Sequence, residues 1–526
     1  MVKLAQKLKG LKLSPGALCF LAGVMYALPY YFKYLFVLSY VALVLLFTTL
    51  LQEENRNRFF KCFYAFAVGF YLFLYLWLSK LYPFAGFDFT RTQGLVIILL
   101  ACVGIPLYHA LLHTLVMCLT KLLPDNDYLI TIGYGAAWML SEWVMTLGKL
   151  AFPWGRAALS QVGLLVSVQT VSLFGSYFIV VILVCASMMF ALALQKHKRL
   201  YAVVGCSVIL LNLIAGTALY YIPADAETDK SVKVGILQGN AASNEKWDKA
   251  KREEILNRYV SMAYEAAENG AELIVLPESA IPIAFSEGGR LYDRFAQIAQ
   301  DNNVTILAGV IILKDDESSY NSVVAVYPDG SVSKPYHKRH IVPFGEYIPY
   351  QSFLEKAIPF IKGLNLGGLD SLAGDKAVVA DINGIQNGSL VCFDSIFDSL
   401  ARDNVKSGAE VITVVTNDSW FKDSAGIEQH LSHSVLRAIE NHRPIIRAAN
   451  TGISAFISPK GEILRRTEPL VTDIIYCDVY ASDSETLYAK TGNLVLYFAL
   501  AFEIIIIILS VYRKARKNHA ENRETV

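Results

Sequence analysis

The chain has 526 residues, of which 54% are hydrophobic, and its formal net charge is +1. It is too long for one ordinary domain and too apolar for an ordinary soluble protein. A nearly neutral chain also lacks the basic surface that nucleic-acid binding requires. We therefore expect no nucleic-acid partner, and a multidomain protein that is partly embedded in a membrane.

The apolar residues are concentrated in two regions, 16–222 and 494–512, whereas 223–488 has the composition of a globular domain. About 20 apolar residues span a bilayer. We predict a membrane domain at 1–222 with seven transmembrane helices, a globular domain at 223–488, and an eighth transmembrane helix with a basic tail at 489–526. The predicted spans are 16–32, 34–51, 62–79, 93–120, 128–147, 166–194, 200–222 and 494–512.

Lysine and arginine residues gather at alternate ends of these spans. They precede the first span and follow the second, fourth, sixth and eighth, whereas the other connections are poorer in positive charge. Positively charged loops stay in the cytoplasm. The pattern predicts that both termini are cytoplasmic and that 223–488 lies on the outer side of the membrane.

Two polar features stand out in the membrane half. Trp154 and Arg156 lie just outside a predicted span, where we favour an interfacial tryptophan with a snorkelling arginine over an access route for lipid headgroups. Glu142 lies inside a span, where an ionisable side chain is costly unless it is paired or faces a cavity. Glu142 is therefore a candidate functional residue.

Strands and helices alternate along 223–488, which predicts a layered α/β domain. Asn383 and Gly384 are typical of a hairpin turn between two of these strands. The predicted strands are 232–238, 272–277, 304–313, 321–327, 378–382, 385–391, 411–416 and a strand-rich 445–457, and the predicted helices are 248–267, 290–300 and 428–440.

Three of the predicted segments end in reactive side chains. Glu278 follows an apolar strand, Lys338 lies in a short basic run, and Cys392 ends another apolar strand. A strand that delivers a thiol to a turn is one way to present a nucleophile. An inert buried cysteine, or a disulfide with Cys477, would also explain Cys392. No cysteine and histidine spacing indicates a metal site.

Together these segments resemble the Glu-Lys-Cys triad of the nitrilase superfamily, and with the multispan half the resemblance narrows to the apolipoprotein N-acyltransferases. It covers essentially the whole chain. It implies a polytopic α-helical membrane domain beside an extracytoplasmic α/β nitrilase-like domain, an αββα sandwich, without cofactor or metal. The other segments that carry it are 238–240, 246–247, 416–421, 437–440 and 443–452.

The resemblance assigns roles to the reactive residues. Cys392 would be the nucleophile and Glu278 the general base. The Lys338 ammonium would face the oxyanion of the tetrahedral intermediates, together with the backbone N–H of Phe393. Glu346 would orient Lys338 or share the role of base.

Two residues depart from the family pattern, because Phe393 and Asp394 stand where a tyrosine and a glutamate are usual. The hydrogen bonds of those side chains are therefore in question. The segment 357–369 is apolar and rich in glycine, which favours either a membrane-dipping lid or a buried loop. Candidates for positioning the substrates are Trp247, Asn321, Asn417 and Trp420, although core packing also explains both tryptophans.

The resemblance implies a two-step acyl transfer at a bacterial inner membrane, with the catalytic domain in the periplasm. The acyl donor would be a phospholipid, and the acceptor the diacylglyceryl-modified N-terminal cysteine of an apolipoprotein. One alternative is a membrane-anchored amidohydrolase of the nitrilase type that acts on a soluble amide, which leaves the many spans unexplained. Another is a transporter with an outer binding domain, for which we would expect more charge inside the spans.

Overall fold

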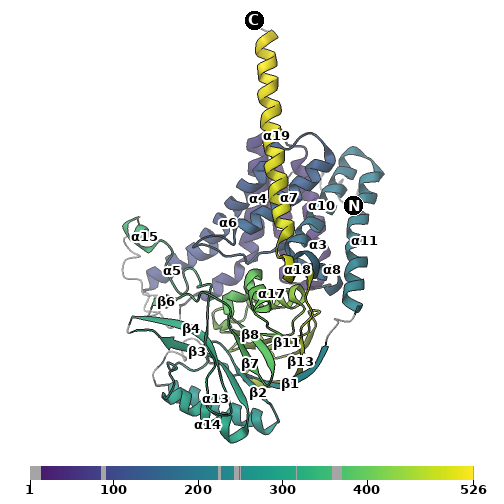
Figure 1. Ribbon diagram of the computed structural model, residues 1–526. Coiled ribbons are helices and arrows are strands. Elements are labelled where there is room, and N and C mark those ends of the chain that lie inside the picture. The colour runs from purple at the N-terminus through teal and green to yellow at the C-terminus, as the bar shows by residue number, and fades with distance from the viewer. Residues whose placement is uncertain are drawn as a thin grey trace.

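The computed structural model describes residues 13–84, 90–222, 227–241, 248, 250–315, 317–357 and 370–524. Trp247 lies outside these ranges. Residues 358–369, which make up nearly all of the predicted lid, also lie outside them. The chain forms a bundle of apolar helices on top of an α/β domain, and the last helix runs along the bundle and extends beyond it (Figure 1).

The helical half contains most of the segments that the sequence predicts as spans. Within the described residues, four helical segments are long and apolar enough to cross a membrane: Arg91–Leu122, Tyr177–Lys196, Arg199–Tyr221 and Leu494–Arg513. The predicted span 166–194 is interrupted at Gly175, whose φ is +76°, so that only its second part is a long helix. The helices are α2 Pro15–Ala27, α3 Val37–Leu50, α4 Arg56–Leu74, α5 Arg91–Leu99, α6 Ile105–Met117, α7 Asp127–Val144, α8 Leu165–Val168, α9 Val171–Phe174, α10 Tyr177–Lys196, α11 Arg199–Tyr221 and α19 Leu494–Glu524.

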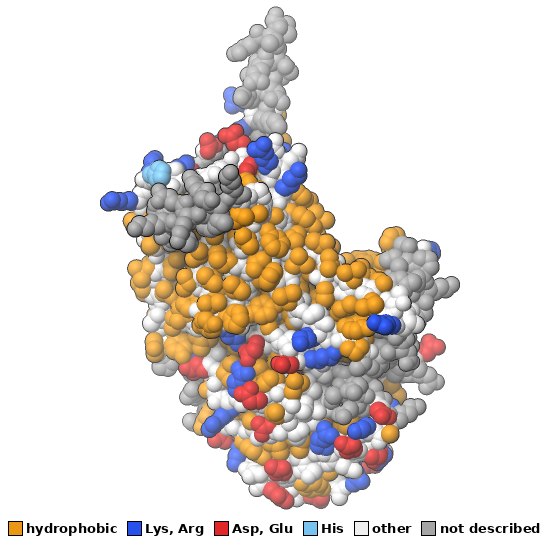
Figure 2. All heavy atoms as spheres, turned by 180° about the vertical axis from the view of Figure 1, so that it is seen from behind, with side chains coloured by type: hydrophobic (Ala, Val, Ile, Leu, Met, Phe, Trp, Pro, Cys, Tyr) orange, Lys and Arg blue, Asp and Glu red, His pale blue; other side chains and the backbone are white. Residues whose placement is uncertain are grey.

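The surface of the helical half is that of a membrane protein. Figure 2 shows a broad hydrophobic band across one face of the bundle, with charged side chains gathered above it, toward the projecting helix, and below it, over the α/β domain. Exposed leucine, isoleucine and aromatic side chains on α11 and α19 contribute to the apolar surface, among them Leu211, Ile214, Phe498 and Ile508. Such an area is far larger than the apolar patches that soluble monomers expose.

The α/β domain contains two sheets. The first has the strand order β13-β1-β2-β3-β4-β5, with β6 also paired to β4, and the second has the order β12-β11-β10-β9-β8-β7. The strands are β1 Glu227–Gln238, β2 Leu273–Leu276, β3 Thr305–Leu313, β4 Ser318–Val326, β5 Tyr336–His337, β6 Asp370–Leu372, β7 Val379–Ile382, β8 Ile385–Val391, β9 Val411–Thr416, β10 Ile445–Ala449, β11 Ala455–Ile457, β12 Ile463–Arg466 and β13 Asp473–Ser482.

The two sheets pack face to face through buried aliphatic side chains such as Ile236, Leu307 and Val415. Helices α13 (Arg252–Glu268) and α14 (Arg290–Asn302) cover the outer face of the first sheet. Helices α16 (Asp398–Lys406) and α17 (Ala425–Asn441) cover the second sheet, and their apolar side chains share one buried cluster with the membrane helices. The predicted αββα sandwich is confirmed, and its second helix layer lies between the sandwich and the membrane half.

The loop between α7 and α8 is part of this junction, which makes the expected interfacial role of Trp154 and Arg156 wrong. The Trp154 Nε1–H donates to the Gln429 side chain at 2.7 Å, and the Arg156 Nη2 lies 2.6 Å from the Asp398 Oδ1. Both residues are buried, because helix α17 and its neighbours cover the loop. Glu142 accepts a hydrogen bond from the Ala157 N–H at 2.9 Å and so holds the same loop.

Candidate active site

Two strand ends and a loop bring a lysine and two carboxylates together: Glu278 follows β2, Lys338 follows β5, and Glu346 lies in the loop after Lys338. The Lys338 Nζ lies 3.3 Å from the Glu278 Oε1 and 2.7 Å from the Glu346 Oε1. Lys338 and Glu278 are buried. Burial by itself would lower the pKa of Lys338, but Glu346 and Glu278 outweigh it and hold that pKa well above its ordinary value. Lys338 is therefore a permanent cation.

Backbone and amide donors fix the orientation of both carboxylates. The Asn321 Nδ2–H donates to the Glu278 Oε1 at 2.6 Å, and the Asn417 N–H donates to the Glu278 Oε2 at 2.8 Å. The Val342 N–H donates to the Glu346 Oε2 at 2.8 Å. Asn321 and Asn417, which we expected to position substrates, thus both contact Glu278.

Cys392 lies in a sharp turn at the end of strand β8. It is the first residue of the 3₁₀ turn η8 (Cys392–Ile396), and its φ of +49° is in the left-handed region that side chains other than glycine rarely adopt. Strained backbone of this kind is characteristic of functional sites. Burial and the nearby Glu278 raise the pKa of the Cys392 thiol, and Lys338 only partly opposes them. The resting side chain is a neutral thiol that needs a base.

The two residues that depart from the family pattern have well-defined contacts. Asp394 accepts hydrogen bonds from the Tyr336 hydroxyl at 2.8 Å and from the His340 N–H at 2.8 Å, as well as from two further backbone N–H groups. Asp394 therefore ties the cysteine turn to the segment that carries Lys338. Phe393 stacks on Phe152 of the membrane half, with ring centroids 5.5 Å apart.

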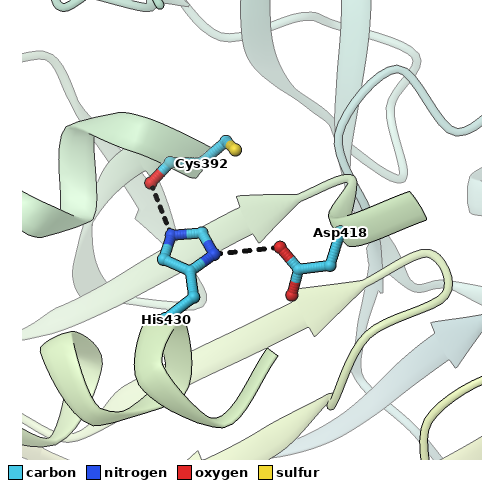
Figure 3. Close-up of side chains that lie close together, drawn as sticks. All are labelled: Cys392, Asp418 and His430. Carbon is cyan, nitrogen blue, oxygen red and sulfur yellow. Dashed lines mark hydrogen bonds and ion pairs between the residues drawn. The ribbon is translucent and has the colours of Figure 1, made fainter. Parts of the chain in front are cut away.

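A buried polar network supports the other side of the cysteine turn (Figure 3). The His430 Nε2 lies 3.3 Å from the Cys392 carbonyl oxygen and 3.1 Å from the Ser395 Oγ, and its Nδ1 lies 2.9 Å from the Asp418 Oδ1. The Arg447 Nη2 donates to the Asp418 Oδ2 at 2.8 Å. His430 thus contacts the backbone of the nucleophile, and the hydrogen bonds of its ring in Figure 3 go to the Cys392 carbonyl oxygen and to Asp418.

Three side chains of this network have the residue types of a metal site. One ligand atom each from Cys392, Asp418 and His430 lies within 4.8 Å of the others. However, both imidazole nitrogens have hydrogen-bond partners, and Asp418 is paired with Arg447. Arg447 and His430 outweigh the effect of burial and hold the pKa of Asp418 below its usual range. The donor set is therefore already occupied by protein groups, and it fits a structural network better than a metal ion.

The sequence reasoning missed the roles of His430 and Arg447. The available signal was Arg447 itself, because an arginine within the apolar strand β10 has to be paired when it is buried.

Trp420 ends the 3₁₀ turn η9 (Asp418–Trp420) that follows β9. Cys392 and Cys477 are both free thiols, so the alternative of a disulfide between them is wrong.

Comparisons with known proteins agree with this architecture. A family model described as the apolipoprotein N-acyltransferase N-terminal domain matches residues 22–189, and one described as carbon-nitrogen hydrolase matches residues 233–488. An apolipoprotein N-acyltransferase from Wigglesworthia glossinidia brevipalpis is 30% identical over 78% of this chain and 81% of its own length. The chain belongs to the apolipoprotein N-acyltransferase family. The Geobacter metallireducens member is 29% identical over 78% of this chain and 79% of its own length.

Members of the apolipoprotein N-acyltransferase family contain both halves of this chain, the membrane helices and the α/β domain, in one enzyme. The α/β domain is also similar to a solved amidase from Nesterenkonia sp., with 17% identity, a TM-score of 0.38, and coverage of 51% of this chain and 95% of that one. The predicted nitrilase-like fold is confirmed by the match to the carbon-nitrogen hydrolase family model and by the two packed sheets, and the predicted membrane helices by the helical segments of membrane-spanning length.

Proposed function

We propose that this protein transfers an acyl chain from a phospholipid to the α-amino group of the diacylglyceryl-modified N-terminal cysteine of apolipoproteins. The observation that carries the proposal is the contact of Lys338 with Glu278 and Glu346 beside the thiol of Cys392. Cys392 would form the thioester, Glu278 would move the proton, and Lys338 would stabilise the oxyanion. Glu346 would hold Lys338 in place.

In the first step, Glu278 takes the thiol proton while the sulfur attacks the ester carbonyl carbon of the phospholipid. The tetrahedral intermediate collapses as the C–O bond breaks, and Glu278 returns the proton to the departing lysophospholipid hydroxyl. Because the raised pKa of the thiol keeps it protonated at rest, transfer of the proton to the base accompanies the attack.

In the second step, the acceptor amine attacks the thioester carbonyl carbon. Glu278 takes a proton from the amine, an amide bond forms, and the C–S bond breaks to restore the thiol. Lys338 would contact the oxyanion in both steps because it is fully charged and fixed between two carboxylates. Closing the site against water would keep the thioester from hydrolysis.

The proposed placement in the cell follows the charge pattern of the spans. The domains would be 1–222, 223–488 and 489–526, with seven transmembrane helices in the first and one in the last. Both termini would be cytoplasmic in a bacterial inner membrane, with the α/β domain in the periplasm. Phe393 of the catalytic turn contacts Phe152 of the helical half, so the thiol would lie close to the lipid that supplies the acyl chain.

A labelled phospholipid tests the proposal directly. Detergent-solubilised protein incubated with acyl-labelled phospholipid should form a covalent adduct that hydroxylamine releases, and Cys392→Ala should abolish it. Cys477→Ala is the matched control, because Cys477 is the other partly buried cysteine in the same domain, and it should leave the adduct unchanged. A wild-type protein that forms no adduct, but hydrolyses soluble amides, would support the amidohydrolase instead.

A further inference from the structure

A second pocket lies where the helical half meets the α/β domain. Its volume is about 220 Å³, and none of the residues that contact Cys392 lines it. It is smaller than the roughly 300–1,000 Å³ of sites for drug-sized ligands, so it suits a small polar group. Its walls are formed by Ser172, Leu173, Leu219, Ile222, His442, Lys460, Ser484, Glu485, Thr486 and Leu487.

The interior of this pocket carries hydrogen-bond donors that the protein does not use fully. The Lys460 Nζ donates to the Leu219 carbonyl oxygen at 2.7 Å, and an ammonium has three donors. No ion pair joins Lys460 to any carboxylate in the described part of the chain. The His442 Nε2 is buried and has no hydrogen-bond partner. That nitrogen has almost no solvent-accessible surface and so lies behind the pocket wall. The spare donors that a ligand in the pocket can reach are those of the Lys460 ammonium, which favour a group that accepts hydrogen bonds.

The charges around the pocket favour an anion. Glu485, the acidic residue of the wall, pairs with Lys490 at 3.1 Å, and both side chains are well exposed. Burial, Lys460 and Arg443 lower the pKa of His442 to about 4. His442 is therefore neutral at ordinary pH, and Lys460 supplies the positive charge.

The rim of the pocket is apolar and lies at the level of the membrane boundary. Ile222 directly follows the end of the span α11, and Leu487 precedes the start of α19 at Leu494. Ile222 and Leu487 are 55% and 45% exposed. An anionic group in the pocket would thus have apolar surface beside it, along helices that face lipid.

We propose that this pocket binds the phosphate-bearing headgroup of a second phospholipid, which acts as a structural lipid rather than as an acyl donor. The phosphate would accept hydrogen bonds from the Lys460 ammonium, and the acyl chains would lie against the apolar rim and α11. Such a lipid would brace the junction between the helical half and the α/β domain. This site is independent of the transfer chemistry at Cys392.

Photocrosslinking from the rim tests the site in the full chain. A benzoylphenylalanine in place of Leu487, in vesicles of phosphatidylglycerol and phosphatidylethanolamine, should capture a phospholipid that mass spectrometry identifies. Adding Lys460→Gln should lower the yield about tenfold, the effect of losing one charged hydrogen-bond partner. Lys233→Gln is the matched control, because the Lys233 Nζ also donates to a backbone carbonyl, that of Asn269, at 2.7 Å. It should leave the yield unchanged.

Three outcomes would overturn the proposal: no phospholipid adduct, a yield that Lys460→Gln does not change, or an adduct that inorganic phosphate displaces as well as phospholipid does. The last would identify a free-phosphate site. If Lys460→Gln does not fold, Lys460→Met, which keeps the apolar stem and removes the same charge, provides the comparison. The hydroxylamine-labile adduct on Cys392 is scored in the same samples, so failure of the proposed acyl transfer is distinguished from failure of this lipid site.

Discussion

The two helix layers of the sandwich differ in what covers their outer faces. Helices α13 and α14 face solvent, and the ion pair between Arg290 and Glu253 is exposed on both sides. Helix α17 lies between the second sheet and the membrane half. Its Arg437 and Glu440 pair at 2.7 Å with no exposure. The same fold thus carries one layer with solvated charges and one with buried charges.

This difference indicates where charge matters in the molecule. Exposed ion pairs contribute about 0–1 kcal/mol to stability. A buried pair adds little overall, but removal of one partner leaves an uncompensated charge. The pair between Arg156 and Asp398 joins the membrane half to the inner layer. We therefore expect the buried pairs to set how the catalytic domain sits on the membrane helices.

The largest expected effect comes from breaking that junction. Arg156→Met leaves Asp398 buried without its cation and should lower the free energy of unfolding by about 3–5 kcal/mol. The matched control is Arg290→Met on α14, where Arg290 and its partner Glu253 are 56% and 53% exposed, and it should cost about 0–1 kcal/mol. Thermal unfolding in detergent measures both. Equal losses in the two variants would contradict the comparison.

A second effect should appear in catalysis rather than in stability. His430→Gln removes an imidazole contact to the Cys392 carbonyl oxygen and should lower kcat by about 10²-fold, the effect of a misplaced reacting group. KM for the phospholipid should change little, because the hydrogen bonds of His430 go to the backbone of Cys392, to Ser395 and to Asp418. A raised KM with unchanged kcat would show that His430 acts in binding instead.

The inner layer should also govern the response to acid. Although burial alone would raise it, Arg156 holds the pKa of Asp398 below its usual range, as Arg447 does for Asp418. The stability from these carboxylates is fully present above the unfolded-state pKa of about 3.9 and is lost as pH falls from there toward the folded-state values. Unfolding free energies at about pH 6 and about pH 3 should therefore differ less in Asp398→Asn than in the wild type. An unchanged difference would be evidence against this linkage.

The smallest expected effect comes from the Phe393 side chain, and it distinguishes a loss of stability from a loss of acyl transfer. Phe393→Leu removes the stacked contact with Phe152 and should cost about 0.5–1.5 kcal/mol. Phe285→Leu removes a contact between Phe285 and Tyr292 in the outer layer and should cost a similar amount. Only Phe393→Leu should slow acyl transfer, as measured by formation of the labelled adduct. Equal activity in both variants would show that the contact with Phe152 has no catalytic role.

The sequence by itself determined the elements and the reactive residues. Apolar runs of membrane-spanning length, and the alternation of strands and helices, follow from the spacing of apolar residues within each segment. Thus the hairpin at Asn383 and Gly384, and the positions of Glu278, Lys338 and Cys392 at or near the ends of strands, follow from neighbouring residues alone. The resemblance to a family then grouped these residues before any distance between them was known.

Only the tertiary structure decided what surrounds them. The spacing of apolar residues in α17 does not show that the membrane half covers the outer face of this helix. The burial of His430 and Arg437 therefore could not be predicted from the sequence of α17. For the same reason Trp154 and Arg156 looked like interfacial residues, although they lie in the junction. Contacts between segments that are distant in sequence depend on how the domains pack. This packing places His430 and Arg447, two ordinary polar residues in the sequence, in the network that contacts the cysteine turn.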